Sequence, residues 1–186
     1  MKDKIMIKSI DLFDEKGFTE TSIQDIVDSI DATKGTFYYY FTSKQELLRD
    51  IHLTYIHNLL KEQAEIINDS SKNVKEKLYT MIYSIINKIE TQGKYARIIF
   101  REMRHLDDAN LEQIKQKRKE FRLNFEKLIQ EGVDKGEFQS QVRTDILSFA
   151  ILGMVNRTYY WFQPDGELSE EELTDLYMEM ILNGIN

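Results

Sequence analysis

Residues 33–41 read Thr-Lys-Gly-Thr-Phe-Tyr-Tyr-Tyr-Phe, a stretch that is polar where it begins and wholly aromatic where it ends. As a short helix, its first turn would offer free N–H groups, hydroxyls and an ammonium, all of which favour an anion. Thr33 is the expected N-cap, and Gly35 would let a partner's backbone come close because it has no side chain. The stretch therefore predicts a helix that meets a phosphate backbone at one end and a hydrophobic core at the other.

The aromatic residues of this helix must divide between its faces, because an α-helix has about 3.6 residues per turn. We expect Phe37, Tyr40 and Phe41 to lie in the core. Tyr38 and Tyr39 are expected to point outward, where they would contact phosphates or base edges of a nucleic acid.

Two more helical patterns precede this stretch. The first ends at Gly17, the second begins at Thr21 or Ser22, and both repeat isoleucine at helical spacing. Only residues 31–32 separate the second pattern from the aromatic helix. A helix, a short turn and a second helix make up the helix-turn-helix arrangement, whose second helix enters the major groove of DNA.

Polar side chains around this arrangement are candidates for DNA contact. Lys44 begins the next helix, so its ammonium and the helix N-terminus would act on one phosphate. Gln24 would reach a base edge or a phosphate, or else lie in solvent. The predicted DNA-binding residues are Thr21, Ser22, Gln24, Thr33, Lys34, Gly35, Thr36, Tyr38, Tyr39 and Lys44.

This part of the sequence resembles the DNA-binding domain of the TetR family of bacterial repressors. The resemblance runs without a gap over roughly residues 3–50 and is carried by the motifs 13–18 (FDEKGF), 21–26 (TSIQDI), 33–41 (TKGTFYYYF) and 43–48 (SKQELL). The chain departs from the family pattern at Asp31, where a turn glycine is common, and at Tyr39, where histidine is common.

Composition limits the possible classes of protein. The chain has 186 residues, no cysteine, one proline and a net charge of −7, so disulfides and thiolate metal sites are excluded. Residues 1–50 carry seven Lys/Arg and ten Asp/Glu, a net −3 that opposes general nucleic-acid binding. The charge is +2 over residues 33–49, however, because Lys34, Lys44 and Arg49 face only Glu46. We therefore expect binding that depends on the site and falls steeply with salt.

The rest of the chain also has helical spacing, and no segment alternates like a strand. Ser43 and Glu46 form an expected capping box that opens a long helix. Gly93 is expected to separate the second and third helices of this part. The expected helices cover about 43–67, 73–92, 95–105, 109–132, 144–162 and 169–183.

The last two helices predict a dimer. The helix over 144–162 is apolar nearly all round, so it needs cover on more than one side. Together with the amphipathic helix over 169–183 it would form half of a four-helix bundle across a two-fold axis, or else the chain's own core. The predicted dimer residues are Ile146, Phe149, Ala150, Gly153, Met154, Arg157, Leu173, Leu176, Tyr177 and Met180.

The C-terminal helices resemble TetR-family regulators that respond to fatty-acyl or steroid-ring CoA thioesters. The motifs are 151–156 (ILGMVN), 160–162 (YWF), 164–166 (PDG) and 168–173 (LSEEEL). Arginines at helical intervals beside apolar residues would hold the phosphates of a CoA ester, or else would pair with Glu102 or Asp107. Asn156 would lie in the pocket wall or at the dimer seam. The predicted ligand residues are Arg97, Phe100, Arg101, Arg104, Phe125, Asn156, Tyr159 and Tyr160.

The predicted fold is all-α with about nine helices: a three-helix DNA-binding domain (1–48) and a helical ligand-binding and dimerisation domain (49–186). The resemblance implies a cytoplasmic, homodimeric repressor that a small apolar effector, such as a fatty-acyl CoA ester, releases from a palindromic operator in double-stranded DNA. No catalytic residue, cofactor, metal or membrane span is expected. The alternative is a helical module that binds a ligand or a partner but does not bind DNA.

Overall fold

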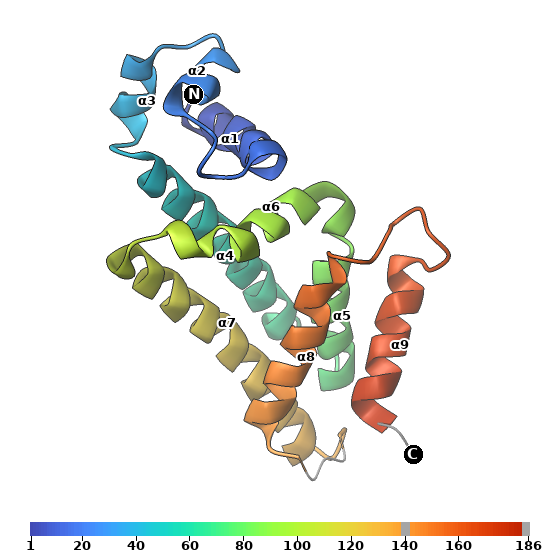
Figure 1. The fold of residues 1–186 in the computed structure, drawn as a ribbon. Coiled ribbons are helices and arrows are strands. Elements are labelled where there is room, and N and C mark those ends of the chain that lie inside the picture. Colours follow the sequence, from blue (N-terminus) through green and yellow to red (C-terminus); the bar gives the residue numbers. More distant parts are fainter. Residues whose placement is uncertain (139–141, 184–186) are drawn as a thin grey trace. The chain divides into compact units, whose positions relative to one another are not determined.

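The computed structural model describes residues 1–138 and 142–183, and every regular element in these ranges is helical (Figure 1). None of these helices is long and apolar enough to cross a membrane. Residues 139–141 and 184–186, which belong to the predicted second domain, lie outside the described residues. The α-helices are α1 (Lys2–Lys16), α2 (Ile23–Asp28), α3 (Lys34–Tyr40), α4 (Lys44–Asn68), α5 (Val74–Ile86), α6 (Ile89–Arg101), α7 (Asp108–Asp134), α8 (Thr144–Thr158) and α9 (Glu170–Asn183), with a 3₁₀ turn, η1, over Met103–His105.

The chain divides into two compact units. The head unit comprises Met1–His57 and Lys94–Lys117, and the body unit comprises Asn58–Gly93 and Arg118–Asn186. Helices α4, α6 and α7 each contribute residues to both units. The boundary predicted at residue 48 falls inside α4 and stays a prediction.

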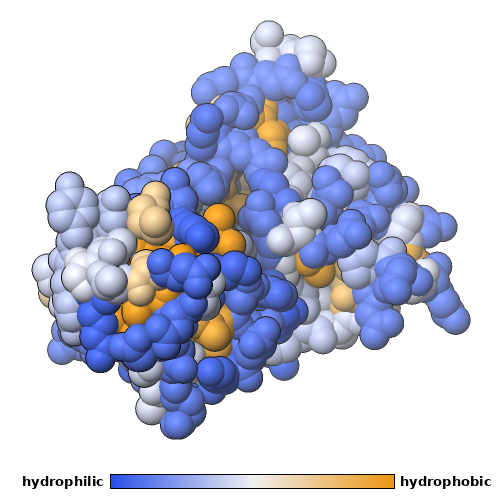
Figure 2. Space-filling view, turned by 90° about the horizontal axis from the view of Figure 1, so that it is seen from above, coloured by the Kyte–Doolittle hydropathy of each residue, from blue (hydrophilic) through white to orange (hydrophobic). Residues whose placement is uncertain are grey.

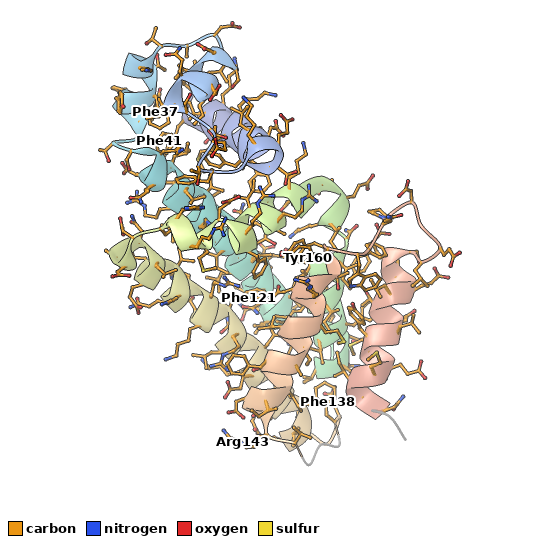
Figure 3. All side chains as sticks on the ribbon, in the orientation of Figure 1. Phe37, Phe41, Phe121, Phe138, Arg143 and Tyr160 are labelled. Atoms are coloured by element: carbon orange, nitrogen blue, oxygen red, sulfur yellow. The ribbon has the colours of Figure 1, made fainter. Side chains whose placement is uncertain are left out.

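The head unit is held by one hydrophobic core to which α1–α4 and parts of α6 and α7 contribute. Phe13, Phe37, Leu47 and Ile98 are completely buried in it. Helix α3 has only seven residues, too few to be stable alone in water. It persists because Phe37 and Phe41 pack against each other and into this core, with ring centroids 5.7 Å apart (Figure 3).

The turn between α2 and α3 accommodates the unusual Asp31. Its backbone takes a φ of 54°, in the left-handed region that a turn glycine would supply. Aspartate is one of the few other residues that adopt this conformation readily. The amide of Ala32 then donates to the carbonyl of Val27 at 2.9 Å, which closes the end of α2.

The starts of α2, α3 and α4 are each set by a capping side chain. Ser22, not Thr21, caps α2, where its hydroxyl accepts from the amide of Asp25. Thr33 caps α3 as predicted. The predicted capping box at Ser43 is only half present. Ser43 accepts from the amide of Glu46 at 3.1 Å, but the Glu46 carboxylate accepts from the amide and hydroxyl of Thr42 instead.

The predicted break at Gly93 is wrong. Gly93 lies buried inside α6, and the helices separate at residues 87–88 instead. A single glycine costs a helix only about 1 kcal/mol, which tertiary packing easily exceeds. Packing also explains the break, because α5 contacts α8 and α9 in the body unit whereas Ile98 and Ile99 of α6 enter the core of the head unit.

The body unit consists of α5, α8, α9 and the adjoining parts of α4, α6 and α7. Its largest fully buried side chains include Phe125, Leu78, Met81 and Ile82. Helix α7 runs past Gly132, where a Cβ atom would lie 2.2 Å from the ring of Phe138. The close approach of this ring therefore requires glycine at position 132.

Candidate nucleic-acid interface

Helix α3 divides its aromatic residues between the core and the surface. Phe37 and Phe41 are buried, and Tyr40 is partly buried against the same core. The Tyr38 side chain is 54% exposed and Tyr39 is 80% exposed. Each ring is supported by an aromatic neighbour, Tyr38 edge-on to Phe37 at 5.6 Å and Tyr39 edge-on to Tyr40 at 4.8 Å. The head unit thus presents two large rings to its surroundings on a firmly anchored helix.

Most other residues predicted to bind DNA also lie on the surface of α2 and α3. Ser22, Gln24, Thr33, Lys34 and Gly35 are exposed, and Thr36 is partly exposed. The amide of Gln24 donates to the carboxylate of Asp28 at 2.6 Å. The structure therefore places these residues together on the arrangement of two short helices that the sequence predicts.

Thr21 is the exception, because its side chain is fully buried. Its hydroxyl lies 2.8 Å from the carbonyl oxygen of Gly17 and 3.2 Å from that of Leu12. This hydroxyl ties the end of α1 to the start of α2. The sequence offered no signal that separates Thr21 from its exposed neighbour Ser22.

Lys44 also has partners within the chain. Its ammonium donates to the carbonyls of Phe18 and Thr21, both at 2.6 Å, and lies 4.5 Å from the ring centroid of Phe18. Burial lowers the pKa of Lys44, while Glu20 and Asp25 act in the opposite direction. A contact between Lys44 and a DNA phosphate would require the ammonium to leave these carbonyls. In the structure Lys44 holds the α1–α2 connection, and with it the start of α2.

Cations from α6 pair with two aspartates of α1. Arg97 makes two hydrogen bonds to the carboxylate of Asp14, at 2.7 and 3.1 Å, and Lys94 pairs with Asp11 at 3.0 Å. The hydrogen bond from Arg97 is the main cause that lowers the pKa of Asp14. The head unit as a whole carries thirteen Lys/Arg and fourteen Asp/Glu, a net −1 in place of the −3 of its N-terminal part. The charge that opposed DNA binding is thereby largely compensated.

The arginines predicted to hold a ligand are thus engaged inside the head unit. Arg101 donates to the carbonyl of Phe13 and pairs with the buried Glu102 at 2.6 Å. Arg104 lies 3.3 Å from the Nε2 atom of His105. The alternative pairing of an arginine with Glu102 is therefore present at Arg101. The acceptors of Arg97 and Arg101 on α1 could not be found from sequence, because they lie more than 80 positions from these arginines along the chain.

The body unit encloses a small cavity between α4, α5 and α7. It measures about 10 Å³, roughly the space one water molecule needs. Phe125, one of the predicted ligand residues, lines this cavity, and Phe121 beside it is labelled in Figure 3. The sequence did not single out the other lining residues, Leu59, Gln63, Ile66, Met81, Ser84 and Phe121.

Gln63 is the main polar group of this cavity and is almost completely buried. Its amide nitrogen donates to the carbonyl of Phe121 at 3.1 Å, and its oxygen accepts from Asn124 at 2.7 Å. The predicted ligand residues Asn156, Tyr159 and Tyr160 are not among the residues that line it. Tyr159 is buried, and its ring lies tilted against that of the exposed Tyr160, with the ring centroids 4.4 Å apart.

Helices α8 and α9 each carry exposed apolar side chains, and the Arg122 guanidinium lies 4.5 Å from the ring centroid of Phe149 on α8. Ile146, Phe149, Leu176 and Met180 are between 45% and 58% exposed. Figure 2 shows one face of the protein, which is largely hydrophilic and carries patches of apolar side chains. Of the other predicted dimer residues, Ala150, Gly153 and Arg157 are exposed and Met154 is partly buried, whereas Leu173 and Tyr177 lie in the core of the body unit.

Two family models match the chain. The model for bacterial regulatory proteins of the tetR family covers residues 5–51, and the model for the tetracyclin repressor-like C-terminal domain covers residues 71–185. The chain belongs to the TetR family. It is a transcriptional regulator with an N-terminal helix-turn-helix and a C-terminal helical domain.

Similar proteins extend over nearly the whole chain. The transcriptional repressor KstR2 of Mycolicibacterium smegmatis is 25% identical over 99% of this chain and 90% of its own length. Among solved structures, PfmR of Thermus thermophilus matches with a TM-score of 0.88 and 26% identity over 98% of each chain. AibR in complex with isovaleryl coenzyme A and operator DNA matches with a TM-score of 0.84 and 26% identity over 97% of each chain.

Replacing Lys44 by methionine tests its position in the head unit. The variant keeps an apolar stem over Phe18 but removes the charged hydrogen bonds. We expect the free energy of unfolding to fall by about 1–3 kcal/mol. The slope of log affinity for DNA against log salt should stay unchanged, because no phosphate contact is lost.

Lys34→Met is the matched control, since Lys34 is exposed on α3. It should leave stability within about 0.5 kcal/mol and reduce the salt slope by about one. Thermal unfolding and titrations at several salt concentrations measure both quantities. A reduced salt slope for Lys44→Met, with stability intact, would instead place Lys44 on a phosphate.

Proposed function

We propose that this protein is a homodimeric repressor that binds a palindromic operator and is released from it by a small, largely apolar effector. The observation that carries the proposal is the surface of α2 and α3. Exposed hydroxyls, Lys34 and two supported tyrosine rings stand there. Buried aromatic residues anchor α3, and buried aliphatic residues anchor α2. Binding, not catalysis, is the activity this surface supports.

Dimerisation follows from the apolar surface on α8 and α9. Large exposed apolar clusters on soluble proteins mark interaction sites. A two-fold axis through this surface would cover it with the same surface of a second copy. Two heads are also what an operator of two half-sites, about one DNA turn apart, requires.

The effector site is proposed at the cavity between α4, α5 and α7. In the structure this cavity has room for about one water molecule, so an effector must enlarge it. Its lining is apolar apart from Gln63 and Ser84, which suits an acyl chain or a ring system. The similar AibR structure contains isovaleryl coenzyme A, and we propose an acyl-CoA ester here as well.

The proposed coupling runs along continuous helices. Helix α4 carries Leu47 in the core of the head unit and Leu59 at the cavity, and α7 carries Ile114 in that core and Phe125 at the cavity. An effector that enlarges the cavity would displace these helices and change the spacing of the two heads. It acts only if it binds the displaced state more tightly than the DNA-bound state.

Selection of bound duplexes from a random DNA pool tests operator binding. We expect recovery of a two-fold symmetric sequence, and weaker binding of this sequence by the Tyr38→Ala variant. Recovery of no sequence at low salt by a folded dimer would favour the alternative, a helical module that binds a ligand or a partner but not DNA.

Phe149→Glu tests the dimer surface, because it places a charge at the exposed apolar surface of α8. Sedimentation velocity should show a dimer for the wild type and a monomer for the variant. Ile7→Glu is the control, since Ile7 on α1 is 52% exposed but lies in the head unit. A wild type that stays monomeric, or a Phe149→Glu variant that stays dimeric, would contradict this surface.

Acyl-CoA esters of graded chain length test the effector site. They should raise the unfolding temperature and release the selected operator, whereas coenzyme A alone should do neither. Phe125→Leu should change the preferred chain length because it alters the cavity wall. Phe13→Leu, an equally buried change in the head unit, should not. Equal release by coenzyme A alone would place recognition on its phosphates and away from this cavity.

A further inference from the structure

We propose that the head unit reads its operator mainly through the 5-methyl groups of thymines, which contact the rings of Tyr38 and Tyr39. This inference rests on the proposed operator binding and specifies its chemistry. It predicts that each half-site contains thymines at positions where the methyl group, and not the hydrogen-bonding edge, is recognised.

The first argument is the set of side chains that α2 and α3 offer. Specific readout in the major groove relies on arginine or lysine for guanine and on asparagine or glutamine for adenine. Residues 22–42 contain neither arginine nor asparagine. Only Gln24 and Lys34 remain as candidates for such readout in this segment.

Neither Gln24 nor Lys34 is positioned to make two hydrogen bonds to one base. The amide of Gln24 already donates to Asp28 at 2.6 Å, so it would have to break a short hydrogen bond to read adenine. The carboxylate of Asp28, beside Gln24, would also lie near the DNA and repel its phosphates. Lys34 carries a single flexible ammonium, which acts as a point charge and suits a phosphate better than a fixed pattern of acceptors.

The second argument is the pair of exposed rings. Tyr38 and Tyr39 present 54% and 80% of their surface, and both sit on the helix that a helix-turn-helix inserts into the major groove. The thymine methyl is the apolar group that the major groove displays, and it is recognised by apolar contact. The rings of Tyr38 and Tyr39 are apolar and lie on the helix that enters the major groove, so they suit contact with thymine methyl groups.

The rings are also held at defined positions. Tyr38 is edge-on to the fully buried Phe37, and Tyr39 is edge-on to the partly buried Tyr40. A side chain held by its neighbours loses less conformational freedom on binding. The tyrosines can therefore discriminate between thymine and a base that lacks the methyl group.

The experiment combines DNA and protein substitutions in one cycle. Each thymine of the selected operator is replaced in turn by uracil, which removes only the methyl group. Binding is measured for the wild type and for the Phe and Ala variants of Tyr38 and Tyr39, whose folding is checked by circular dichroism. Both side chains are exposed, so these variants should fold.

We expect uracil to weaken wild-type binding about fourfold for each contacted methyl group. The Phe variants keep the ring and should keep this sensitivity to uracil. Tyr38→Ala or Tyr39→Ala should remove it at the position that the ring contacts. This pattern would establish that the rings read thymine.

Three results would overturn the inference while operator binding stands. The first is tolerance of uracil at every position, and the second is a uracil effect that persists in both Ala variants. The third is a Tyr→Phe variant that weakens binding as much as Tyr→Ala, which would assign the hydroxyls to phosphates. Absence of any selected operator is a different failure, since it would remove the proposed function itself.

Discussion

The recognition helix of this protein depends on burial of its own aromatic residues. Helix α3 is seven residues long, and an isolated helix of this length does not form in water. Phe37 and Phe41 bury completely or almost completely in the core of the head unit, and the exposed Tyr38 stands between them in the sequence. The same packing that stabilises the helix therefore sets the direction of the side chains that face outward.

Polar contacts then hold the elements around this helix in place. Lys44 binds carbonyls of the α1–α2 connection, and the hydroxyl of Thr21 binds the end of α1. Arg97 and Lys94 of α6 pair with Asp14 and Asp11 of α1. These contacts support the DNA-binding surface. The two ion pairs also offset acidic residues of the N-terminal part, so its acidic sequence is compatible with operator binding.

The apolar residues of the body unit include a buried set and an exposed set. Residues such as Phe125 and Met81 face inward around a cavity of about 10 Å³, and Phe149 and Met180 face outward from α8 and α9. The first set suits an apolar effector and the second set suits a partner subunit. Helices α4 and α7 carry residues of the cavity and of the head core, which gives the proposed effector a direct route to the DNA-binding elements.

The sequence by itself determined the all-helical class, the helix-turn-helix and the division of α3 into buried and exposed rings, because hydrophobic spacing and capping are local. Only the tertiary structure decided the break between α5 and α6, the burial of Thr21 and the partners of Lys44 and Arg97. Arg97 and Asp14 are 83 positions apart, and nothing in local spacing reveals such a pair. Contacts of this kind arise from packing between distant segments, which places a charged side chain according to where its partner lies in space.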